Sequence, residues 1–155
     1  MKNKAIIVDI DGTIADGKWR IVGKDLTNID WNKENLNSLH DQPFSWCVNL
    51  VNIYYKSGYS IVFLTARTGT VECYEVTHKW LQENLPDNVD YQLFMREERD
   101  ERGDDVIKKD IYLKHIEPHY EVELAIDDKP SVIDMWRSLG VAALHCNEYY
   151  YGINK

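Results

Sequence analysis

The stretch that decides the fold is AIIVDIDGTIADGKW, residues 5–19, which joins a short apolar run to two closely spaced aspartates. Residues 5–10 are mostly aliphatic and β-branched, a composition typical of a strand that is buried on both faces of a parallel sheet. Side chains two residues apart in a strand point to the same side, so Asp9 and Asp11 should emerge together where this strand ends. Two interpretations of the turn that follows are possible.

The first interpretation is a nucleotide-binding phosphate loop. From Gly12 to Lys18 the chain spells G-x-x-x-x-G-K, which is all but the last letter of that motif. The missing letter is a Ser or Thr whose hydroxyl binds Mg²⁺, and a helix should begin at this point. The residue here is Trp19, which offers no oxygen, and residues 20–23 do not resemble a helix start. We therefore favour the second interpretation.

The second interpretation takes D-x-D-G-T, residues 9–13, as a reactive carboxylate pair. Open α/β sheets bind ligands at the carboxyl ends of their strands, which is where both aspartates should lie. Adjacent carboxylates repel each other and raise a pKa unless a cation is close. A divalent cation removes that penalty and leaves Asp9 ionised, so that it can act as a nucleophile.

The rest of the chain alternates strand-like and helix-like segments. Apolar runs predict strands at residues 5–10, 59–64, 91–95, 122–126 and 141–145, and apolar periodicity predicts helices at residues 45–56, 71–85, 104–116 and 130–139. This alternation indicates a doubly wound α/β fold with a mainly parallel five-stranded sheet, helices on both faces and no large cap domain. Residues 12–43 are polar and without periodicity, so we expect a flap over the strand ends within one domain spanning residues 1–155.

Composition limits the classes of function. Hydrophobic residues make up 44% of the 155 residues and no apolar run is long enough to cross a membrane, which favours a cytoplasmic protein without a membrane partner. Its 3 cysteines are scattered, so we expect free thiols rather than a disulfide or a zinc site. A net charge of -8 makes general nucleic-acid binding unfavourable, because duplex affinity comes largely from cations that neutralise phosphates.

Further polar residues follow the other strands. Thr65 and Arg67 come after the second predicted strand, and Asp127 and Asp128 come directly after the fourth. Lys108 lies on the helix that precedes this fourth strand. Because each separation leaves room for a βα unit, these groups can converge at one edge of the sheet. The combination of hydroxyl, lysine and carboxylate pair predicts a phosphoryl-transfer site.

These motifs resemble the haloacid dehalogenase-like (HAD) superfamily, in which D-x-D-G-T is followed by a hydroxyl, a lysine and an aspartate pair. Within that superfamily the chain is similar to the 3′-phosphatase domains of bacteriophage polynucleotide kinase/3′-phosphatases. The resemblance covers nearly the whole chain. Its most specific parts are the M-R-x-x-x-D-x-R-x-D-D-V-x-K pattern over residues 95–108, KHIEPH over residues 114–119 and LAIDD with VIDMWRSLGV within residues 124–141.

The resemblance implies a Mg²⁺-dependent reaction through an aspartyl-phosphate. It implies that Asp9 is the nucleophile and that Asp11 is the general acid and base. It also implies that Thr65 and Lys108 bind the phosphoryl oxygens. The implied metal site combines Asp9, Asp11, Asp127 and Asp128. The implied substrate-binding residues are Arg20, Arg67, Arg96 and Arg102, while Asp100 belongs to the same signature as the last two.

The substrate that the resemblance implies is a 3′-phosphorylated DNA or RNA end. The chain lacks a true phosphate loop, so we expect no 5′-kinase activity from it. Two alternatives stay open: the same chemistry on a small nucleotide or another phosphomonoester, and a non-catalytic module that grips a phosphorylated end. Tyr149 and the two tyrosines at residues 150–151 could stack on bases, but we favour a packed or frayed chain end as their explanation.

Overall fold

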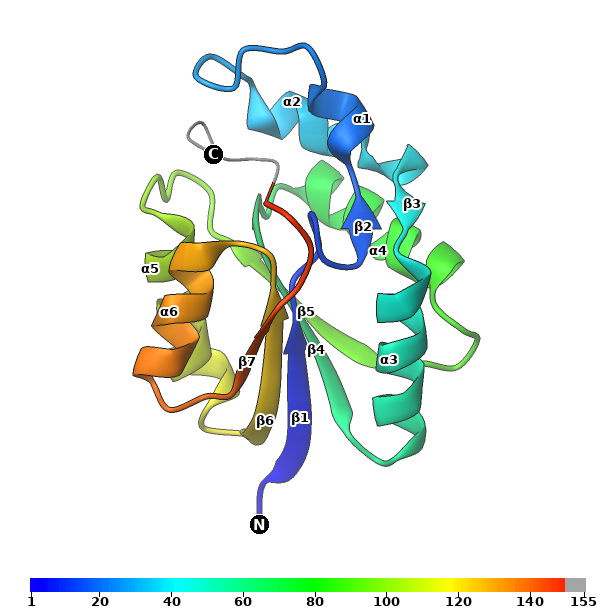
Figure 1. The fold of residues 1–155 in the computed structure, drawn as a ribbon, viewed down its shortest axis with the longest axis vertical. Coiled ribbons are helices and arrows are strands. Elements are labelled where there is room, and N and C mark those ends of the chain that lie inside the picture. The colour runs from blue at the N-terminus through cyan, green and yellow to red at the C-terminus, as the bar shows by residue number, and fades with distance from the viewer. Residues whose placement is uncertain (150–155) are drawn as a thin grey trace.

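The computed structural model describes residues 1–149 and contains a five-stranded sheet between two layers of helices (Figure 1). The strand order is β5-β4-β1-β6-β7, and all four neighbouring pairs are parallel. The strands are β1 (Asn3–Val8), β4 (Ser60–Thr68), β5 (Tyr91–Arg96), β6 (Tyr120–Asp127) and β7 (Ala143–His145). The predicted doubly wound α/β class is confirmed, and no large cap domain is present within the described residues.

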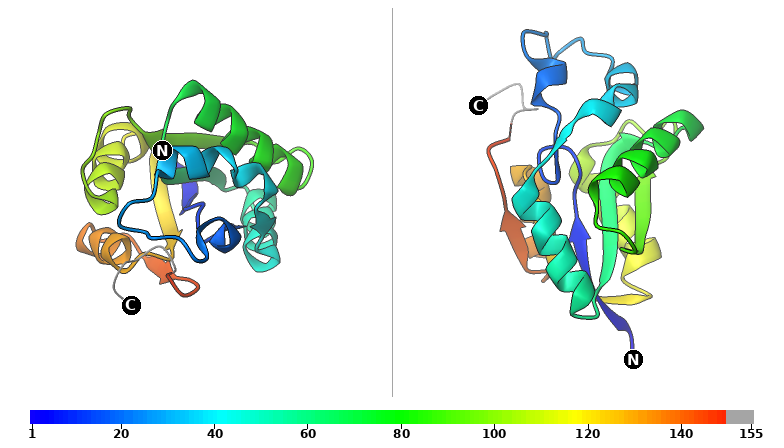
Figure 2. Two further views of the ribbon diagram at one scale, coloured as in Figure 1. Left: turned by 90° about the horizontal axis from the view of Figure 1, so that it is seen from above. Right: turned by 90° about the vertical axis from the view of Figure 1, so that its right-hand side faces the viewer.

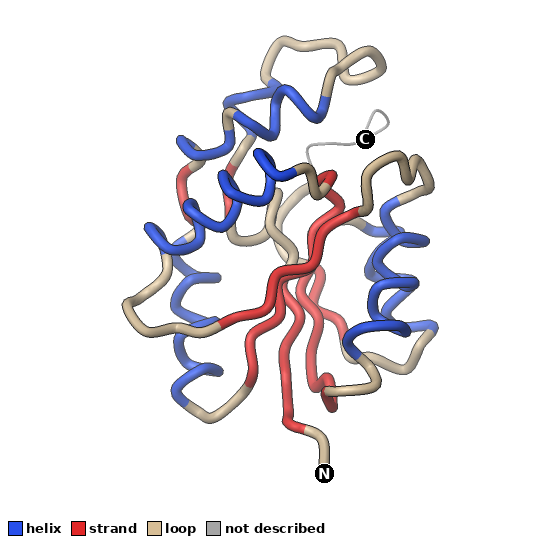
Figure 3. Tube along the Cα trace, turned by 180° about the vertical axis from the view of Figure 1, so that it is seen from behind, coloured by secondary structure: helices blue, strands red, loops and turns tan. Residues whose placement is uncertain are grey.

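Helices cover both faces of this sheet, as the view from behind also shows (Figure 3). The face covered by α3 (Ser45–Lys56) and α4 (Val71–Asn84) is opposite the one covered by α5 (Asp104–Ile111) and α6 (Pro130–Ser138). The sequence predicted one helix over residues 104–116, but its last turn is a π-helix, η2 (Tyr112–Ile116). Pro130 lies in the first turn of α6, where a missing N–H costs nothing.

The core consists of two layers that share β1. Ile6 and Val8 pack toward α3 and α4, whereas Ala5 and Ile7 pack toward α5 and α6. This alternation is what a strand buried on both faces requires. Trp80 on α4 and Trp136 on α6 are fully buried in these two layers.

Two helices bury a face that differs in part from the predicted one. Apolar spacing predicts a buried face with Trp46, Leu50, Ile53 and Tyr54 on α3, and one with Val76, Trp80 and Leu81 on α4. On α3 the inward residues are Cys47 and Val51, while Trp46 and Ile53 are exposed. This helix has apolar residues around most of its circumference, so periodicity alone does not identify the buried side. On α4, Trp80 and Leu81 point inward as predicted, but the remaining buried positions belong to Cys73 and Thr77 rather than to Val76.

The strand order places a topological switch point beside β1. From β1 the chain moves outward through β4 to β5, then returns to the other side of β1 with β6. In open α/β sheets the crevice at such a point, outside the carboxyl ends of the strands, is where ligands bind. An aspartate lies at this end of both strands: Asp9 directly follows β1, and Asp127 is the last residue of β6.

The flap, residues 12–43, is more ordered than the sequence predicted. It contains β2 (Ala15–Asp16) paired antiparallel with β3 (Gln42–Pro43), the short helices α1 (Lys18–Ile21) and α2 (Trp31–Leu36), and the 3₁₀ turn η1 (Ser38–His40). The expectation that no helix begins near Trp19 is wrong, because α1 starts at Lys18, whose N–H donates to Asp16. Figure 2 shows these elements lying above the strand ends.

Two further predictions concern cysteines and membranes. The three cysteines are free, and two of them, Cys47 and Cys73, are buried. No helix within residues 1–149 is long and apolar enough to cross a membrane. The tyrosines at residues 150–151 lie outside the described residues.

Candidate active site

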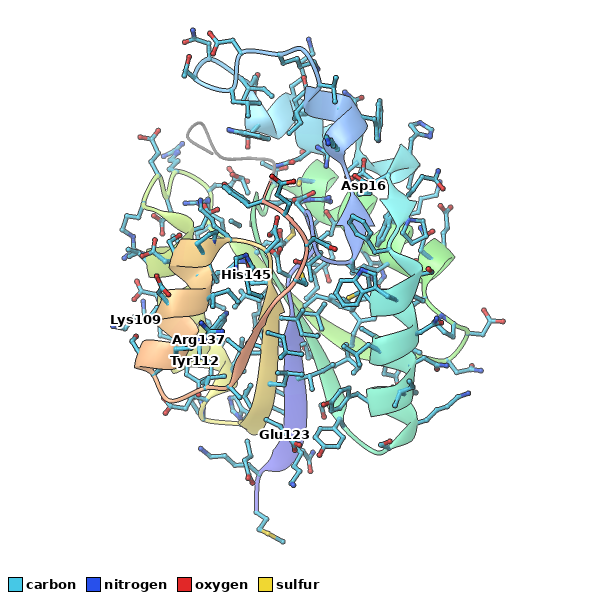
Figure 4. All side chains as sticks on the ribbon, in the orientation of Figure 1. Asp16, Lys109, Tyr112, Glu123, Arg137 and His145 are labelled. Carbon is cyan, nitrogen blue, oxygen red and sulfur yellow. The ribbon has the colours of Figure 1, made fainter. Side chains whose placement is uncertain are left out.

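A cleft of about 500 Å³ opens at the carboxyl ends of the strands, beneath the flap. In Figure 4, Asp16 marks the flap side of the molecule and Glu123 lies toward the opposite end of the sheet. All ten residues that the sequence predicted for the site line this one cleft: Asp9, Asp11, Arg20, Thr65, Arg67, Arg96, Arg102, Lys108, Asp127 and Asp128. Residues from six separate segments of the chain therefore meet here.

Asp9 follows β1 directly and is held on both of its carboxylate oxygens. Its Oδ1 accepts a hydrogen bond from Lys108 Nζ at 2.8 Å, and its Oδ2 accepts one from Thr13 Oγ1 at 2.9 Å. Its backbone N–H donates to the Ile126 carbonyl of β6. The residue is only 6% exposed, so the position of its side chain is set by the protein rather than by solvent.

Lys108 joins the ends of two strands. Its Nζ lies 2.8 Å from Asp9 and 2.6 Å from Asp127 Oδ2, and the side chain is buried. Burial lowers the pKa of Lys108, but the two carboxylates more than reverse this and raise it above its ordinary value. The ammonium is therefore a permanent positive charge beside Asp9.

Asp9, Asp127 and Asp128 form a buried acidic cluster in which one oxygen from each lies within 4.8 Å of the others. Asp128 Oδ2 is buried without a hydrogen-bond partner. Burial, with Asp9 and Asp127 close by, raises the pKa of Asp128 to about 10, and similar causes raise that of Asp9 to about 7. One lysine cannot neutralise three carboxylates, so this cluster fits a divalent cation with oxygen ligands.

Asp11 is held by two arginines. Arg67 donates from Nε to Oδ2 at 2.9 Å and from Nη2 to Oδ1 at 2.7 Å, and Arg20 Nη2 donates to Oδ1 at 3.0 Å. Burial raises the pKa of Asp11, but Arg67 and, to a smaller extent, Arg20 outweigh this effect and lower the pKa to about 2. In this arrangement Asp11 is a carboxylate.

Asp41 is an important residue that the sequence did not indicate. Its side chain is fully buried and accepts two hydrogen bonds of 2.8 Å from Arg20 and one of 2.9 Å from Trp19 Nε1. Its carbonyl accepts from Trp80 Nε1 at 2.8 Å, which ties the flap to α4. Nothing in the polar, non-periodic segment that contains Asp41 distinguishes it from the other acidic residues nearby.

The remaining predicted residues have different surroundings. Thr65 is buried at the cleft floor, and its Oγ1 accepts a hydrogen bond from the backbone N–H of Arg67 at 3.2 Å. Arg96 bonds the backbone carbonyls of residues 66, 100 and 102 and forms an ion pair with Asp104 at 2.8 Å, so it orders the loop over residues 97–103. Arg102 is half-exposed on that loop and pairs with Asp100 and Asp110.

The first turn after β1 does not form a phosphate loop. Gly12 N–H donates to the Ala15 carbonyl, and the chain continues into β2. Gly17 has no room for a side chain, because a Cβ there would lie 2.3 Å from the Arg20 guanidinium. The glycine that completes the apparent G-x-x-x-x-G-K motif therefore makes space for Arg20.

Comparisons with known proteins agree with this geometry. The family described as "Polynucleotide kinase PNKP phosphatase domain" matches residues 3–151. A protein of Autographa californica nuclear polyhedrosis virus, named "Putative bifunctional polynucleotide kinase/RNA ligase", is 26% identical over 148 residues, which are 94% of this chain and 20% of the viral protein.

Solved structures of two other proteins are similar to this chain. The structure titled "Structure of the Pnkp1/Rnl/Hen1 RNA repair complex" contains a chain that is 28% identical, with a TM-score of 0.77, over 96% of this chain and 44% of that one. A class C acid phosphatase from Bacillus anthracis with tungstate bound shares the fold, with a TM-score of 0.68 at 16% identity, over 100% of this chain and 75% of that one. The chain thus spans less than half the length of the first two relatives.

Family membership explains three observations together: the order of the site residues along the chain, their meeting at one cleft, and the match over residues 3–151. The chain belongs to the polynucleotide kinase phosphatase-domain family of the HAD superfamily.

Proposed function

We propose that this protein is a Mg²⁺-dependent phosphomonoesterase that removes 3′-phosphates from polynucleotide ends through an aspartyl-phosphate. The observation that carries the proposal is the contact of Lys108 with both Asp9 and Asp127, beside the unpartnered oxygen of Asp128. It joins a buried carboxylate nucleophile, a permanent cation and a place for a metal within one cleft. Membership of the family supports phosphoester hydrolysis.

In the first step an Asp9 oxygen attacks phosphorus, and the bond between phosphorus and the 3′ oxygen breaks. Lys108 and Thr65, both buried beside Asp9, bind phosphoryl oxygens as charge spreads over them. The hydrogen bond from Thr13 holds the second Asp9 oxygen and so limits its rotation. The products of this step are the aspartyl-phosphate and the released strand.

The carboxylates of Asp9, Asp127 and Asp128, together with the backbone carbonyl of Asp11, would hold Mg²⁺. When bound, the ion neutralises charge on the carboxylates and on the phosphoryl oxygens.

Asp11 acts as acid and then as base. It protonates the leaving 3′ oxygen, and it afterwards takes a proton from the water that hydrolyses the aspartyl-phosphate, leaving inorganic phosphate. The second role needs the carboxylate form, which Arg20 and Arg67 maintain. The first role needs a proton, which a phosphomonoester monoanion can carry into the site. Asp11 can accept this proton once the substrate phosphate has drawn Arg20 and Arg67 away from it.

The arginines have distinct parts in this proposal. Arg20 and Arg67 hold Asp11, and because guanidinium groups also bind phosphate, a substrate phosphate would compete for them. Arg102 stands at the cleft rim, where it can reach a strand, whereas Arg96 supports the loop that carries Arg102. These assignments keep all four as substrate-binding residues, Arg96 indirectly.

The relatives support a nucleic-acid end as the substrate. One occurs in a complex whose title concerns RNA repair, and another is named for a polynucleotide kinase and an RNA ligase. We therefore place this chain in a repair-like setting in the cytoplasm, acting on DNA or RNA ends that other activities would seal or rephosphorylate.

One assay tests the proposal against its alternatives. Phosphate release is measured from a 3′-phosphorylated oligonucleotide, a 3′-mononucleotide and an aryl phosphate, each with Mg²⁺ or with EDTA. We expect Mg²⁺-dependent release that is fastest from the oligonucleotide and absent in Asp9→Asn. Equal rates on all three substrates would instead support a general small-molecule phosphatase, and no release from any would support a binding module.

A further inference from the structure

The two walls of the cleft differ in chemistry. Apart from Arg20, which is held by Asp11 and Asp41, the flap lines the cleft with the uncharged residues Leu26, Trp31, Asn32 and Asn35. The opposite wall, from the loop over residues 96–104 and from Lys129, consists largely of charged side chains. A substrate that fills the cleft must therefore meet an apolar and amide surface on one side and ionic groups on the other.

The ionic wall has little positive charge to spare for a polyanion. Arg96 pairs with Asp104 at 2.8 Å, Lys129 pairs with the same aspartate at 2.9 Å, and Arg102 pairs with Asp100 and Asp110. Glu101 adds a further negative charge to this wall. With a net charge of -8 on the whole chain, contacts to successive backbone phosphates are a weak source of affinity.

The uncharged wall offers a different source of affinity. Trp31 is the first residue of α2, lines the cleft and is 36% exposed. Aromatic rings bind single-stranded nucleic acids by stacking on bases, and this contact needs no positive charge. The cleft volume of about 500 Å³ exceeds what a phosphate group alone occupies and lies in the range typical of small-molecule sites.

The position of this wall relative to the nucleophile is set by buried contacts. Asp41 and Arg20 of the flap bond each other, and Arg20 also bonds Asp11 beside Asp9. Arg67 of β4 donates to Ser38 of the flap at 3.0 Å. Since these groups are buried, Trp31 is carried on a segment that is fixed to the catalytic floor.

We propose that Trp31 is the surface on which a base of the two 3′-terminal nucleotides stacks while the terminal phosphate lies at Asp9. This inference rests on the proposed function. It makes the flap the part of the site that determines substrate specificity. The site then recognises the bases at a strand end rather than the charge of the strand, which reconciles an acidic protein with a nucleic-acid substrate.

The test compares two substrates and three proteins. One substrate is a 3′-phosphorylated oligonucleotide, and the other is the same strand with no bases on its last two nucleotides. The proteins are the wild type, Trp31→Ala and Trp46→Ala, where Trp46 is a similarly exposed tryptophan on α3 that does not line the cleft. Circular dichroism checks that all three are folded.

We expect Trp31→Ala to reduce kcat/KM on the ordinary strand by about 5- to 150-fold, which corresponds to the stacking free energy of one base. The loss should be several-fold smaller on the strand without terminal bases, and Trp31→Phe should recover most of the activity. Trp46→Ala should match the wild type on both strands. Equal losses on the two strands, or no loss on either, would overturn the inference, whereas a wild-type protein inactive on both strands would instead refute the proposed function.

Discussion

Arg67 and Asp11 form a two-point ion pair across the cleft floor, with N–O distances of 2.9 and 2.7 Å, and both charges are largely withdrawn from water. Arg67 also lies 3.7 Å from Asp41 and donates to Thr77 Oγ1 on α4 at 3.0 Å. One guanidinium thus connects β4, α4 and the flap to Asp11. This pair organises the flap side of the site.

Removing Arg67 should destabilise the protein strongly. Arg67→Ala leaves Asp11 and Asp41 with Arg20 as their one remaining guanidinium, and breaking such a buried pair typically costs about 3–5 kcal/mol. Denaturant titration of the free energy of unfolding measures the effect. The matched control is Arg102→Ala, which removes solvent-exposed ion pairs and should change the free energy of unfolding far less. Equal effects of the two variants would contradict the structural role of Arg67.

Asp9→Asn should abolish phosphate release while leaving the fold intact. The amide keeps the size of the side chain but is a far weaker nucleophile, and the replacement removes one of three negative charges that share a single lysine. We therefore expect no loss of thermal stability in the absence of metal. Asp134→Asn, on the outer side of α6, serves as a control for the same chemical change. Hydrolysis at the wild-type rate by folded Asp9→Asn would rule out Asp9 as the nucleophile.

The sequence predicted much of this arrangement because its signals are local. Short β-branched runs that end in aspartates identified β1 and β6 together with Asp9, Asp127 and Asp128, and Gly or Pro residues marked most helix ends. Each of these features depends on residues close together in the chain.

The features that the sequence did not predict depend on distant contacts. Asp41 and Ser38 matter because the flap folds back onto Arg67. Thr77 is buried because α4, on which it lies, packs against α2 and η1 of the flap. A one-turn helix such as α1 is too short for periodicity to reveal. The buried side of α3 likewise follows from its packing on the sheet and not from its own pattern.

Metal binding should stabilise the wild-type fold and depend on Asp128. A cation that binds only the folded protein raises its stability in proportion to the logarithm of ion concentration, so Mg²⁺ should raise Tm and EDTA should reverse the rise. Asp128→Asn removes a charge from the acidic cluster and should weaken the Mg²⁺-induced shift severely. Asp105→Asn on α5, outside the cluster, should leave the shift unchanged. A full shift in Asp128→Asn would exclude this residue as a ligand.

The three thiols should be almost unreactive in the native protein. Burial raises the pKa of Cys146 to about 12, and it raises the pKa values of Cys47 and Cys73 as well. Because the thiolate is the reactive form, alkylation should stay slow between about pH 7 and 9, a range in which an exposed cysteine becomes markedly faster. Thiol titration should find three reactive groups only after denaturation in guanidinium chloride. Rapid reaction of native Cys47 or Cys73 would contradict the burial of these two side chains.

The activity should depend only weakly on salt. For single-stranded nucleic acid, the logarithm of affinity falls with the logarithm of salt concentration with a slope of about -0.7 for each phosphate contacted. The cations of the ionic wall already pair with Asp100, Asp104 and Asp110, so the strand should gain few contacts beyond its terminal phosphate. We therefore expect a slope shallower than about -2 for kcat/KM on an oligonucleotide, measured at fixed Mg²⁺. A slope of about -4 or steeper would mean that the strand displaces these ion pairs and that backbone phosphates, not bases, supply the affinity.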